Sequence, residues 1–541
     1  MLIKLAIAPL FLPALASLCL PGTCFASAQI PRERVHGNMN KVDEDPSALY
    51  QQLMSLQSSL KARSVEMSLI DVVQKGIENN TGLAAAFSTI QEYEWQLIAA
   101  KRKWMPTMNL INGQPFAGYQ WTTFVQNRYG AKGKRGGKSQ ENQSEFDEIP
   151  IGPGTPIFQS YKGQQFQNLP GATVSWNFIL PTRQSDINAA SESLKQQKLL
   201  FDVSARNLIL NMQQAYFSLQ RSQLLIESFR DIYDINKQEL ELLEAQKSIG
   251  MATVYDVEQT RSQLFTQLSQ LVRYSQNYIQ QAAQLAKLLA LPPGSIVIPS
   301  EPASIYWSWD QTMESTIAKG IDQREEIMAS LAAAQSARWS GISMIRSYLP
   351  VFQLVGSGNY NFSDGYTNVP VQSDPGESYT WNSAWTTTAG IGFTWSIFDG
   401  GINAARAQAL YSKSRGLKAK AAEETFDVVK QIETSYGQML TSRIAISSAR
   451  QAYHSAQKAQ KAARARFAVG VGNITSVVQS IQLLSTASQQ VAEAMLSYNN
   501  AVAELYRYSA TWPGIAESEV RQRMKSMRDM RSEATTHFDF E

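Results

Sequence analysis

The sequence predicts a mixed α and β protein in which long paired helices alternate with short amphipathic strands. Three observations support this prediction: one pattern occurs twice along the chain, the longest segments have coiled-coil spacing, and four segments alternate between polar and apolar residues. The chain has 541 residues, of which 44% are hydrophobic, and a formal net charge of +3. It can therefore bury a large core, and it lacks the strongly basic charge that would predict a nucleic-acid partner.

The first 28 residues have the organisation of a secretory signal peptide. Lys4 precedes an apolar stretch over residues 5–20, and residues 26–28 have the small side chains of a cleavage site. Cleavage there would remove Cys19 and Cys24, the only cysteines of the chain, so the mature protein would have neither disulfides nor cysteine-ligated metals. Lipid attachment at either cysteine is a minor alternative, because neither directly follows a small residue.

The rest of the chain contains two copies of one pattern. Trp95 and Trp339 are 244 residues apart, and Trp176 and Trp395 are 219 residues apart. This change of offset predicts an insertion of about 25 residues in a loop of the first copy. Later matches are 220 residues apart and include Tyr216 with Tyr436, Gly250 with Gly470, Val257 with Val477, Gln259 with Gln479, Tyr278 with Tyr498 and Leu285 with Leu505.

Each copy is predicted to run as one helix, two strands and two very long helices. The opening helices cover about residues 68–104 and 309–348, and each is closed by a proline, because proline cannot continue a helix. Apolar residues recur at steps of three and four on the second long helix of each copy, which is the spacing of a coiled-coil seam. The long helices cover about residues 183–249, 253–291, 402–469 and 473–512.

The four strands are predicted from period-two alternation over about ten residues each. Residues 173–180 and 389–398 alternate clearly, whereas residues 107–119 and 351–362 alternate less cleanly. The alternative interpretation of these four segments is two hairpins of a soluble protein, each with one face buried, instead of a sheet in a membrane. Four strands are too few to close a barrel, for which about eight are needed, so oligomerisation is implied. The residues expected to face lipid are Trp176, Phe178, Ile391, Phe393 and Trp395.

The tandem copies, the glycines between the long helices and the strand ends at residues 176–181 and 395–401 resemble the TolC-type outer-membrane efflux protein family, the outer membrane factors. The resemblance covers about residues 68–513. It implies a homotrimeric 12-stranded outer-membrane β-barrel with four strands per protomer, continued by a long α-helical coiled-coil periplasmic tunnel. It also implies a place in the cell outer membrane, in contact with its lipid, with most of the mass in the periplasm.

By the same resemblance, the protein would be the passive exit duct of a tripartite export system. Its partners would be a periplasmic adaptor (membrane fusion) protein and an inner-membrane ABC, RND or MFS exporter. The alternative is a soluble periplasmic structural coiled-coil protein without a membrane barrel. The domains would then be the signal peptide (1–28), an N-terminal periplasmic segment (29–67), the first efflux-protein repeat (68–293), a linker (294–308), the second repeat (309–513) and a charged C-terminal tail (514–541).

The resemblance places a periplasmic constriction at the turns between the long helices. Relatives carry acidic residues where this chain has Ser476 and Gln479, so Asp256 and Glu258 are the alternative source of charge. Helix capping is a competing role for Asp256 and Ser476. The constriction candidates are Asp256, Glu258, Gln259, Ser476 and Gln479, and the candidate tips of the helical turns are Gly250, Gly470 and Gly472.

The sequence predicts no enzyme, cofactor or metal site. His36, His454 and His537 are far apart in the sequence and form no metal-binding or catalytic motif. Residues 131–138 are basic but lack the glycine spacing and the flanking strand and helix of a phosphate loop. We expect them to lie in an extracellular loop that contacts anionic lipid head groups.

Overall fold

The computed structural model describes residues 46–61, 64–129, 156–292, 294–370, 375–514 and 516–536. The predicted signal peptide, residues 29–45 of the N-terminal segment and the basic loop at residues 131–138 lie outside these residues. The chain divides into two units, 1–52 and 53–541, and only the start of α1 (Pro46–Lys61) is described in the first. All other elements belong to the second unit.

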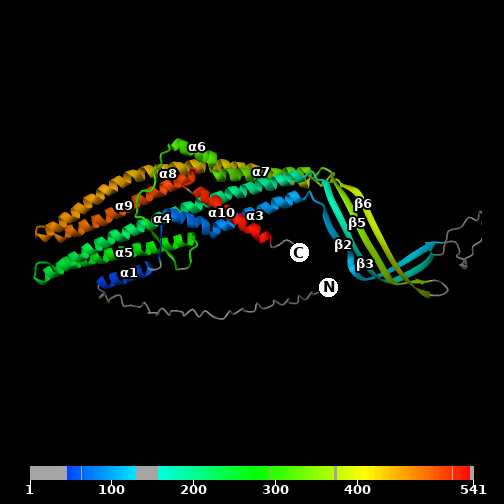
Figure 1. Cartoon of the computed structure of the whole chain (residues 1–541), viewed down its shortest axis with the longest axis horizontal. Coiled ribbons are helices and arrows are strands. Elements are labelled where there is room, and N and C mark those ends of the chain that lie inside the picture. The colour runs from blue at the N-terminus through cyan, green and yellow to red at the C-terminus, as the bar shows by residue number, and fades with distance from the viewer. Residues whose placement is uncertain are drawn as a thin grey trace, which may run out of the picture. The chain divides into compact units, whose positions relative to one another are not determined.

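The second unit presents the same order of elements twice (Figure 1). The first run is α2 (Leu69–Asn79), α3 (Thr81–Arg102), β2 (Thr107–Tyr129), β3 (Pro156–Ile179), α4 (Arg183–Ser248) and α5 (Val254–Leu288). The second is α6 (Met313–Gln323), α7 (Glu325–Arg346), β5 (Val351–Pro370), β6 (Pro375–Thr394), α8 (Ile402–Ala468) and α9 (Ile474–Tyr508). Outside these runs lie β1 (Ser64–Met67), which pairs in parallel with β4 (Ile296–Pro299), and α10 (Ala516–Thr536).

The long helices are the frame of the helical part. With 66 residues in α4 and 67 in α8, each helix is about 100 Å long at 1.5 Å per residue. Helix α4 packs against α3, α5, α7 and α9, and α8 packs against α6, α7 and α9. The predicted seams on α5 and α9 are buried along most of their length, which confirms the coiled-coil spacing. None of the described helices is both long enough and apolar enough to cross a bilayer.

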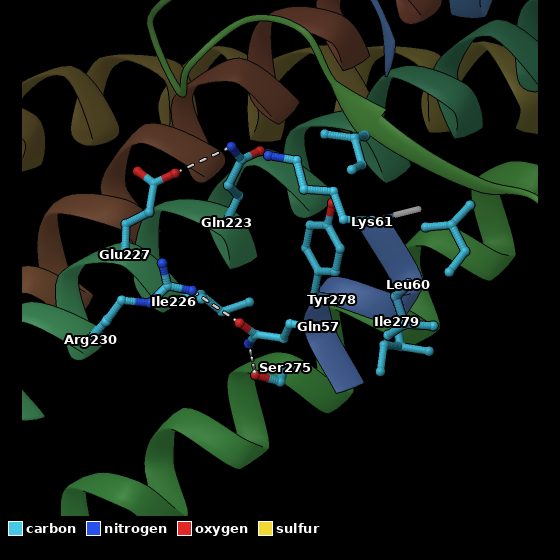
Figure 2. A pocket seen from close by; sticks show the side chains of 12 residues that line it. Gln57, Leu60, Lys61, Gln223, Ile226, Glu227, Arg230, Ser275, Tyr278 and Ile279 are labelled. Carbon is cyan, nitrogen blue, oxygen red and sulfur yellow. Dashed lines mark hydrogen bonds between the residues drawn. The ribbon is translucent and has the colours of Figure 1, made fainter. Parts of the chain in front are cut away.

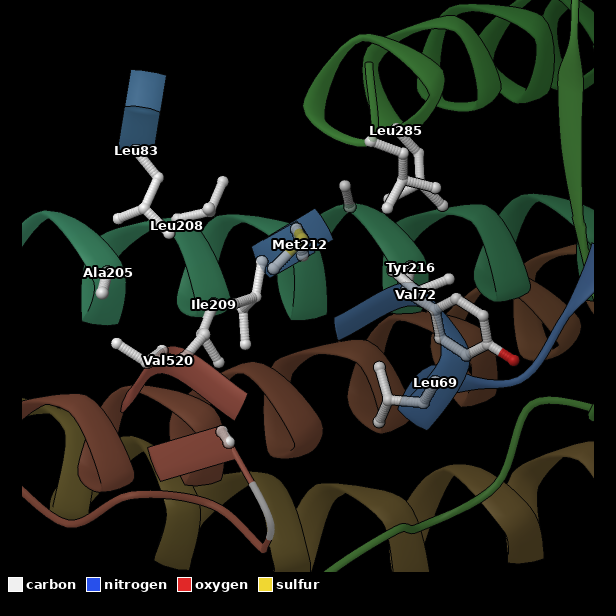
Figure 3. Packing of buried hydrophobic residues seen from close by; sticks show 14 of the residues in the cluster. Leu69, Val72, Leu83, Ala205, Leu208, Ile209, Met212, Tyr216, Leu285 and Val520 are labelled. Atoms are coloured by element: carbon white, nitrogen blue, oxygen red, sulfur yellow. The ribbon is translucent and has the colours of Figure 1, made fainter. Parts of the chain in front are cut away.

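The largest core cluster surrounds the middle of α4 (Figure 3). Met212 and Tyr216 are fully buried there with Val72 of α2 and Leu285 of α5. Burying such a side chain stabilises the fold by about 1.5–3 kcal/mol. Helix α2 comes close to α4 at Gly76, where a Cβ atom would lie 2.0 Å from the Met212 sulfur.

The prediction of one opening helix per copy is wrong, because each is broken in two. The break between α2 and α3 lies at Asn80, whose backbone is extended, with ψ 119°. Its side chain accepts a hydrogen bond from Leu83 N (3.0 Å) and donates one to Leu288 O (2.9 Å), so tertiary contacts favour the break. The second copy breaks at Arg324, with ψ 120°, and the Arg324 side chain binds Gln431 of α8 instead.

The strands and the C-terminal tail also differ from expectation. The strands have 20 to 24 residues rather than about ten, because hydrogen-bonded pairing continues where the polar and apolar alternation fades. Residues 395–398, expected in a strand, follow the end of β6. The tail forms α10, which buries Ala516, Val520 and Met527 in the cluster around α4. These few apolar residues stand among many charged ones, so the segment appeared in the sequence only as a polar tail.

Candidate functional site

The sheet exposes a row of apolar side chains on one face. Its strands are antiparallel in the order β2-β3-β5-β6, and Leu354 of β5 lies opposite both Ile391 of β6 and Trp176 of β3. Ile391 is 72% and Phe393 66% exposed. Because side chains alternate across a strand, the other face carries polar or small residues such as Gln353, Gly390 and Gly392. We call this row the apolar band; its members are Met108, Leu110, Val174, Trp176, Phe178, Phe352, Leu354, Ile391 and Phe393.

Ring contacts connect the strands within the apolar band. Phe178 lies 6.2 Å from Trp176 and 6.3 Å from Phe352, and Phe352 lies 6.0 Å from Phe393, measured between ring centroids. The structure thus brings together four of the five residues expected to face lipid, namely Trp176, Phe178, Ile391 and Phe393.

The two matching tryptophans are anchored in the same way at the boundary between sheet and helices. The Trp176 indole donates a hydrogen bond to the carbonyl of Trp104 (2.8 Å), and the Trp395 indole donates one to the carbonyl of Tyr348 (2.9 Å). Both side chains keep an apolar body exposed while their only donor is satisfied. This arrangement suits an interface between water and an apolar medium.

Asp399 forms the junction between β6 and α8. Its carboxylate accepts hydrogen bonds from the Tyr348 hydroxyl (2.7 Å) and from the backbone N–H groups of Gly401 and Asn403 (2.9 Å each). The Tyr348 hydroxyl and these backbone donors hold the pKa of Asp399 below its ordinary value. Asp399 is not among the site residues predicted from the sequence, although it stands within the strand-end motif at residues 395–401.

The candidate tip glycines differ in their backbones. Gly250 and Gly470 have left-handed φ values of +81° and +78°. After each glycine the chain folds back on its helix, since Met251 N donates to Gln246 O (2.9 Å) and Val471 N donates to Arg466 O (3.0 Å). Such a helix end favours glycine because other residues are strained there. Gly472 has no left-handed φ, but a Cβ atom there would lie 3.0 Å from the backbone nitrogen of Phe467.

The acidic candidates at the first tip have local partners. Asp256 forms a capping box with Thr253, whose backbone N–H (3.0 Å) and hydroxyl (2.6 Å) both donate to its carboxylate. Glu258 pairs with Arg261 (2.8 Å), which also binds Glu244 (2.9 Å). The capping role considered for Asp256 is therefore present, and both charges are partly compensated.

At the second tip, Asn473 caps α9 through a hydrogen bond from Thr475 N (3.1 Å), rather than Ser476. Ser476 and Gln479 are exposed, and Gln259 of the first tip is half-buried. Among the described residues, no hydrogen bond or ion pair joins the candidates of one tip to those of the other.

Both tips expose apolar side chains that are not among the residues predicted to form the constriction. On the first tip they include Met251, 74% exposed, and on the second Val471, 72% exposed. The signal was available in the sequence, because apolar residues directly flank Gly250 and Gly470 where a solvated turn would favour polar ones. The exposed apolar set of the two tips is Ile249, Met251, Val254, Tyr255, Val469 and Val471.

Helix α7 forms ion pairs with long helices of both copies. Arg206 of α4 binds Glu325 of α7 at 2.8 Å, with both side chains less than 9% exposed. Glu326 accepts from Arg324 (2.9 Å) and from Arg507 of α9. Burial disfavours the Glu326 carboxylate, but Arg507 and Arg324 outweigh this effect and lower its pKa. No short motif in the sequence signals these long-range contacts.

The described residues contain no group of three or more His, Cys, Asp or Glu side chains arranged to hold a metal.

Comparison with known sequences is decisive for the family. Residues 72–291 and 321–511 match the family model "Outer membrane efflux protein". The chain belongs to this outer membrane efflux protein family. It is therefore a protein of the cell outer membrane with most of its mass in the periplasm.

Individual members of the outer membrane efflux protein family are distant relatives. The outer membrane protein TolC of Escherichia coli (strain K12) is 22% identical over 307 residues, which cover 56% of this chain and 61% of that protein. TolC of Vibrio cholerae is 22% identical over 365 residues, covering 66% of this chain and 80% of that protein. The match thus spans less than two thirds of the Escherichia coli relative.

Solved structures support the fold. The CmeC outer membrane channel of Campylobacter jejuni has a TM-score of 0.61 over 84% of this chain and 89% of its own, at 16% identity. At this identity the similarity concerns the fold alone. The efflux protein family consists of channel proteins, which is consistent with the expectation that the chain is not an enzyme.

Proposed function

We propose that three copies of this chain form a passive exit duct through the outer membrane. The observation that carries the proposal is the apolar band on a sheet whose outer strands, β2 and β6, each pair on one side only among the described residues. These edges are 23 and 20 residues long, and long unpaired edges invite pairing with another chain. Pairing β6 of one protomer with β2 of the next would give a 12-stranded barrel with its apolar band toward lipid.

The helices would continue this barrel as a coiled-coil tunnel across the periplasm. Helix α8 exposes Phe426 (76%) and Ile444 (71%), and contact with a neighbouring protomer would remove these large apolar side chains from water. Asp256, Glu258, Gln259, Ser476 and Gln479 would line the periplasmic end. Because Glu258 is paired with Arg261 and Asp256 caps α5, the constriction would be only weakly acidic.

The partners we propose are a periplasmic adaptor and an inner-membrane exporter of the ABC, RND or MFS class. The exposed apolar set of the tips offers the adaptor a surface, since solvent-exposed apolar patches often mark protein interfaces. Removal of the signal peptide at residue 28 and the assignment of residues 68–293 and 309–513 as two efflux-protein repeats belong to the same proposal.

Cell fractionation tests the duct against the soluble coiled-coil alternative. We expect the protein in the outer-membrane fraction, extracted by detergent as an oligomer that resists heating in gel-loading buffer. Release of a monomer by osmotic shock would contradict the proposal and favour the soluble protein. If the system exports toxic compounds, deletion of the gene should make the cells more sensitive to them. If it exports proteins, deletion should cause these proteins to be retained in the cell.

A further inference from the structure

A cavity of about 190 Å³ lies at the base of the first helical pair (Figure 2). Helices α1, α4 and α5 and strand β4 contribute its walls. The apolar part of the lining comes from Leu60, Ile226, Tyr278, Ile279, Ile296 and Ile298. A cavity of roughly 150 Å³ lined by apolar side chains is large enough to bind benzene, so this one has room for an aromatic ring with a small substituent.

The polar part of the lining carries more positive than negative charge. Arg230 and Lys61 line it with one acid, Glu227, which accepts a hydrogen bond from Gln223 (3.3 Å). Within the described ranges, neither Arg230 nor Lys61 has a carboxylate within 4.0 Å. A cation beside an apolar wall therefore lacks a counter-charge here.

Arg230 is held in place by one hydrogen bond, and its Nε atom has no hydrogen-bond partner among the described residues. One terminal nitrogen donates to the Gln57 side chain (3.0 Å), and Gln57 in turn donates to the Ser275 hydroxyl (2.8 Å), as Figure 2 shows. The Nε atom of Arg230 is buried. Because Nε is closed to solvent, a ligand carboxylate would bind the guanidinium through its terminal nitrogens.

Tyr278 adds an uncharged donor beside the apolar wall. Burial raises the pKa of the Tyr278 phenol to about 12, so its hydroxyl remains protonated at neutral pH. The cavity thus combines a guanidinium, an ammonium and a neutral hydroxyl with an apolar wall of isoleucines. A carboxylate attached to a compact apolar body complements all of these groups.

We propose that this cavity binds a small amphipathic organic anion, such as an aromatic monocarboxylate, with its carboxylate at Arg230 and its ring against the apolar wall. Such a ligand would link α1 to the α4–α5 pair. The site lies between helices of one chain, so ligand binding there does not depend on the proposed duct.

Fluorine NMR of the full chain in detergent tests the site, with para-fluorobenzoate as the probe and its neutral amide, para-fluorobenzamide, as the matched compound. We expect saturable broadening of the benzoate signal and binding of the amide that is weaker by about tenfold, because the amide lacks the charge that Arg230 recognises. Equal binding of both compounds, or no saturable binding of the benzoate, would overturn the proposal. This comparison needs no variant.

Three variants locate the site. Ile279→Trp fills the cavity and should abolish binding, and Arg230→Gln should weaken benzoate binding by about tenfold while leaving amide binding unchanged. Arg273→Gln is the control, because Arg273 is exposed on α5 and does not line the cavity. Benzoate binding that survives Ile279→Trp in an assembled protein would contradict the assignment. If Arg230→Gln does not assemble, Tyr278→Phe replaces it, with a smaller loss expected.

Discussion

The substitution Ile391→Lys on β6 distinguishes a sheet in lipid from a sheet in water. Ile391 is 72% exposed and lies opposite Leu354 in the apolar band. In an aqueous protein, a change at such an exposed position alters the free energy of unfolding by about 0.5 kcal/mol or less. On the outer face of a barrel at the bilayer midplane, a lysine costs about 2–4 kcal/mol.

The depth of Ile391 determines which of these costs applies. With Trp395 at the membrane interface, four residues at about 3.4 Å each along a strand tilted by about 40° put Ile391 roughly 10 Å deeper. The midplane of an apolar band about 25 Å tall lies close to that depth. We therefore expect close to the full cost, and roughly three times that amount for a trimer.

The assay is denaturant unfolding from phospholipid vesicles, together with the yield of heat-resistant oligomer. Thr386→Lys is the matched control, because Thr386 is exposed on the same strand but lies on the opposite face from Ile391. We expect Ile391→Lys to lower the free energy of unfolding by about 2 kcal/mol or more per protomer, and Thr386→Lys to change it by about 0.5 kcal/mol or less. Equal effects of the two lysines would refute the lipid-facing band.

Three further predictions concern the helical part. Gly470→Ala, at φ +78°, should cost about 1–2 kcal/mol of stability in thermal unfolding and alter drug tolerance or export. Asp256→Asn should weaken the cap of α5 by about 1 kcal/mol or less and lower cation preference in planar bilayers. The pKa of Glu326 is lower in the folded chain than its unfolded value of about 4.5, so its stabilising effect is present above that pH and is lost as the pH falls through the folded pKa. Glu326→Gln should therefore flatten the loss of stability below about pH 4.5 in acid titrations followed by circular dichroism.

Each of these predictions has a result that contradicts it. Normal stability and export in Gly470→Ala would show that the left-handed turn is dispensable. Unchanged selectivity in Asp256→Asn would remove Asp256 from the constriction. An acid transition of the same steepness in Glu326→Gln would mean that other carboxylates control it.

Features with a local cause could be predicted from the sequence. The seam positions on α5 and α9 follow from steps of three and four, because burial on one helix face repeats with that period. The turns at Gly250 and Gly470 follow from the need for a left-handed residue. Gly76 and Gly320 are 244 residues apart, like Trp95 and Trp339, and they share a physical basis. A Cβ atom at Gly76 would clash with α4, and one at Gly320 would clash with α8.

Features with a long-range cause could not be predicted. The break at Arg324 depends on Gln431, 107 residues away, and has no local signal. The break at Asn80 also involves the distant Leu288, but Asn80 caps α3 through Leu83 N, and the run Asn-Asn-Thr-Gly at residues 79–82 is a local signal for it. The ion pairs of Arg206 with Glu325 and of Arg507 with Glu326 join α7 to α4 and to α9, and no local sequence pattern signals them. The strands are longer than the side-chain alternation predicts, because backbone pairing continues where the alternation stops.

Disulfide trapping between β2 and β6 tests the shared barrel most directly. Within one protomer these strands are separated by β3 and β5, which puts them about 14 Å apart, beyond the roughly 7 Å between Cα atoms that a disulfide can bridge. Leu110→Cys combined in turn with Ala389→Cys, Ile391→Cys or Phe393→Cys can therefore form a bond only between chains. Oxidation of intact cells should yield covalently linked dimers and trimers for at least one pair. Monomers alone across the whole series would contradict the claim that three chains close one barrel.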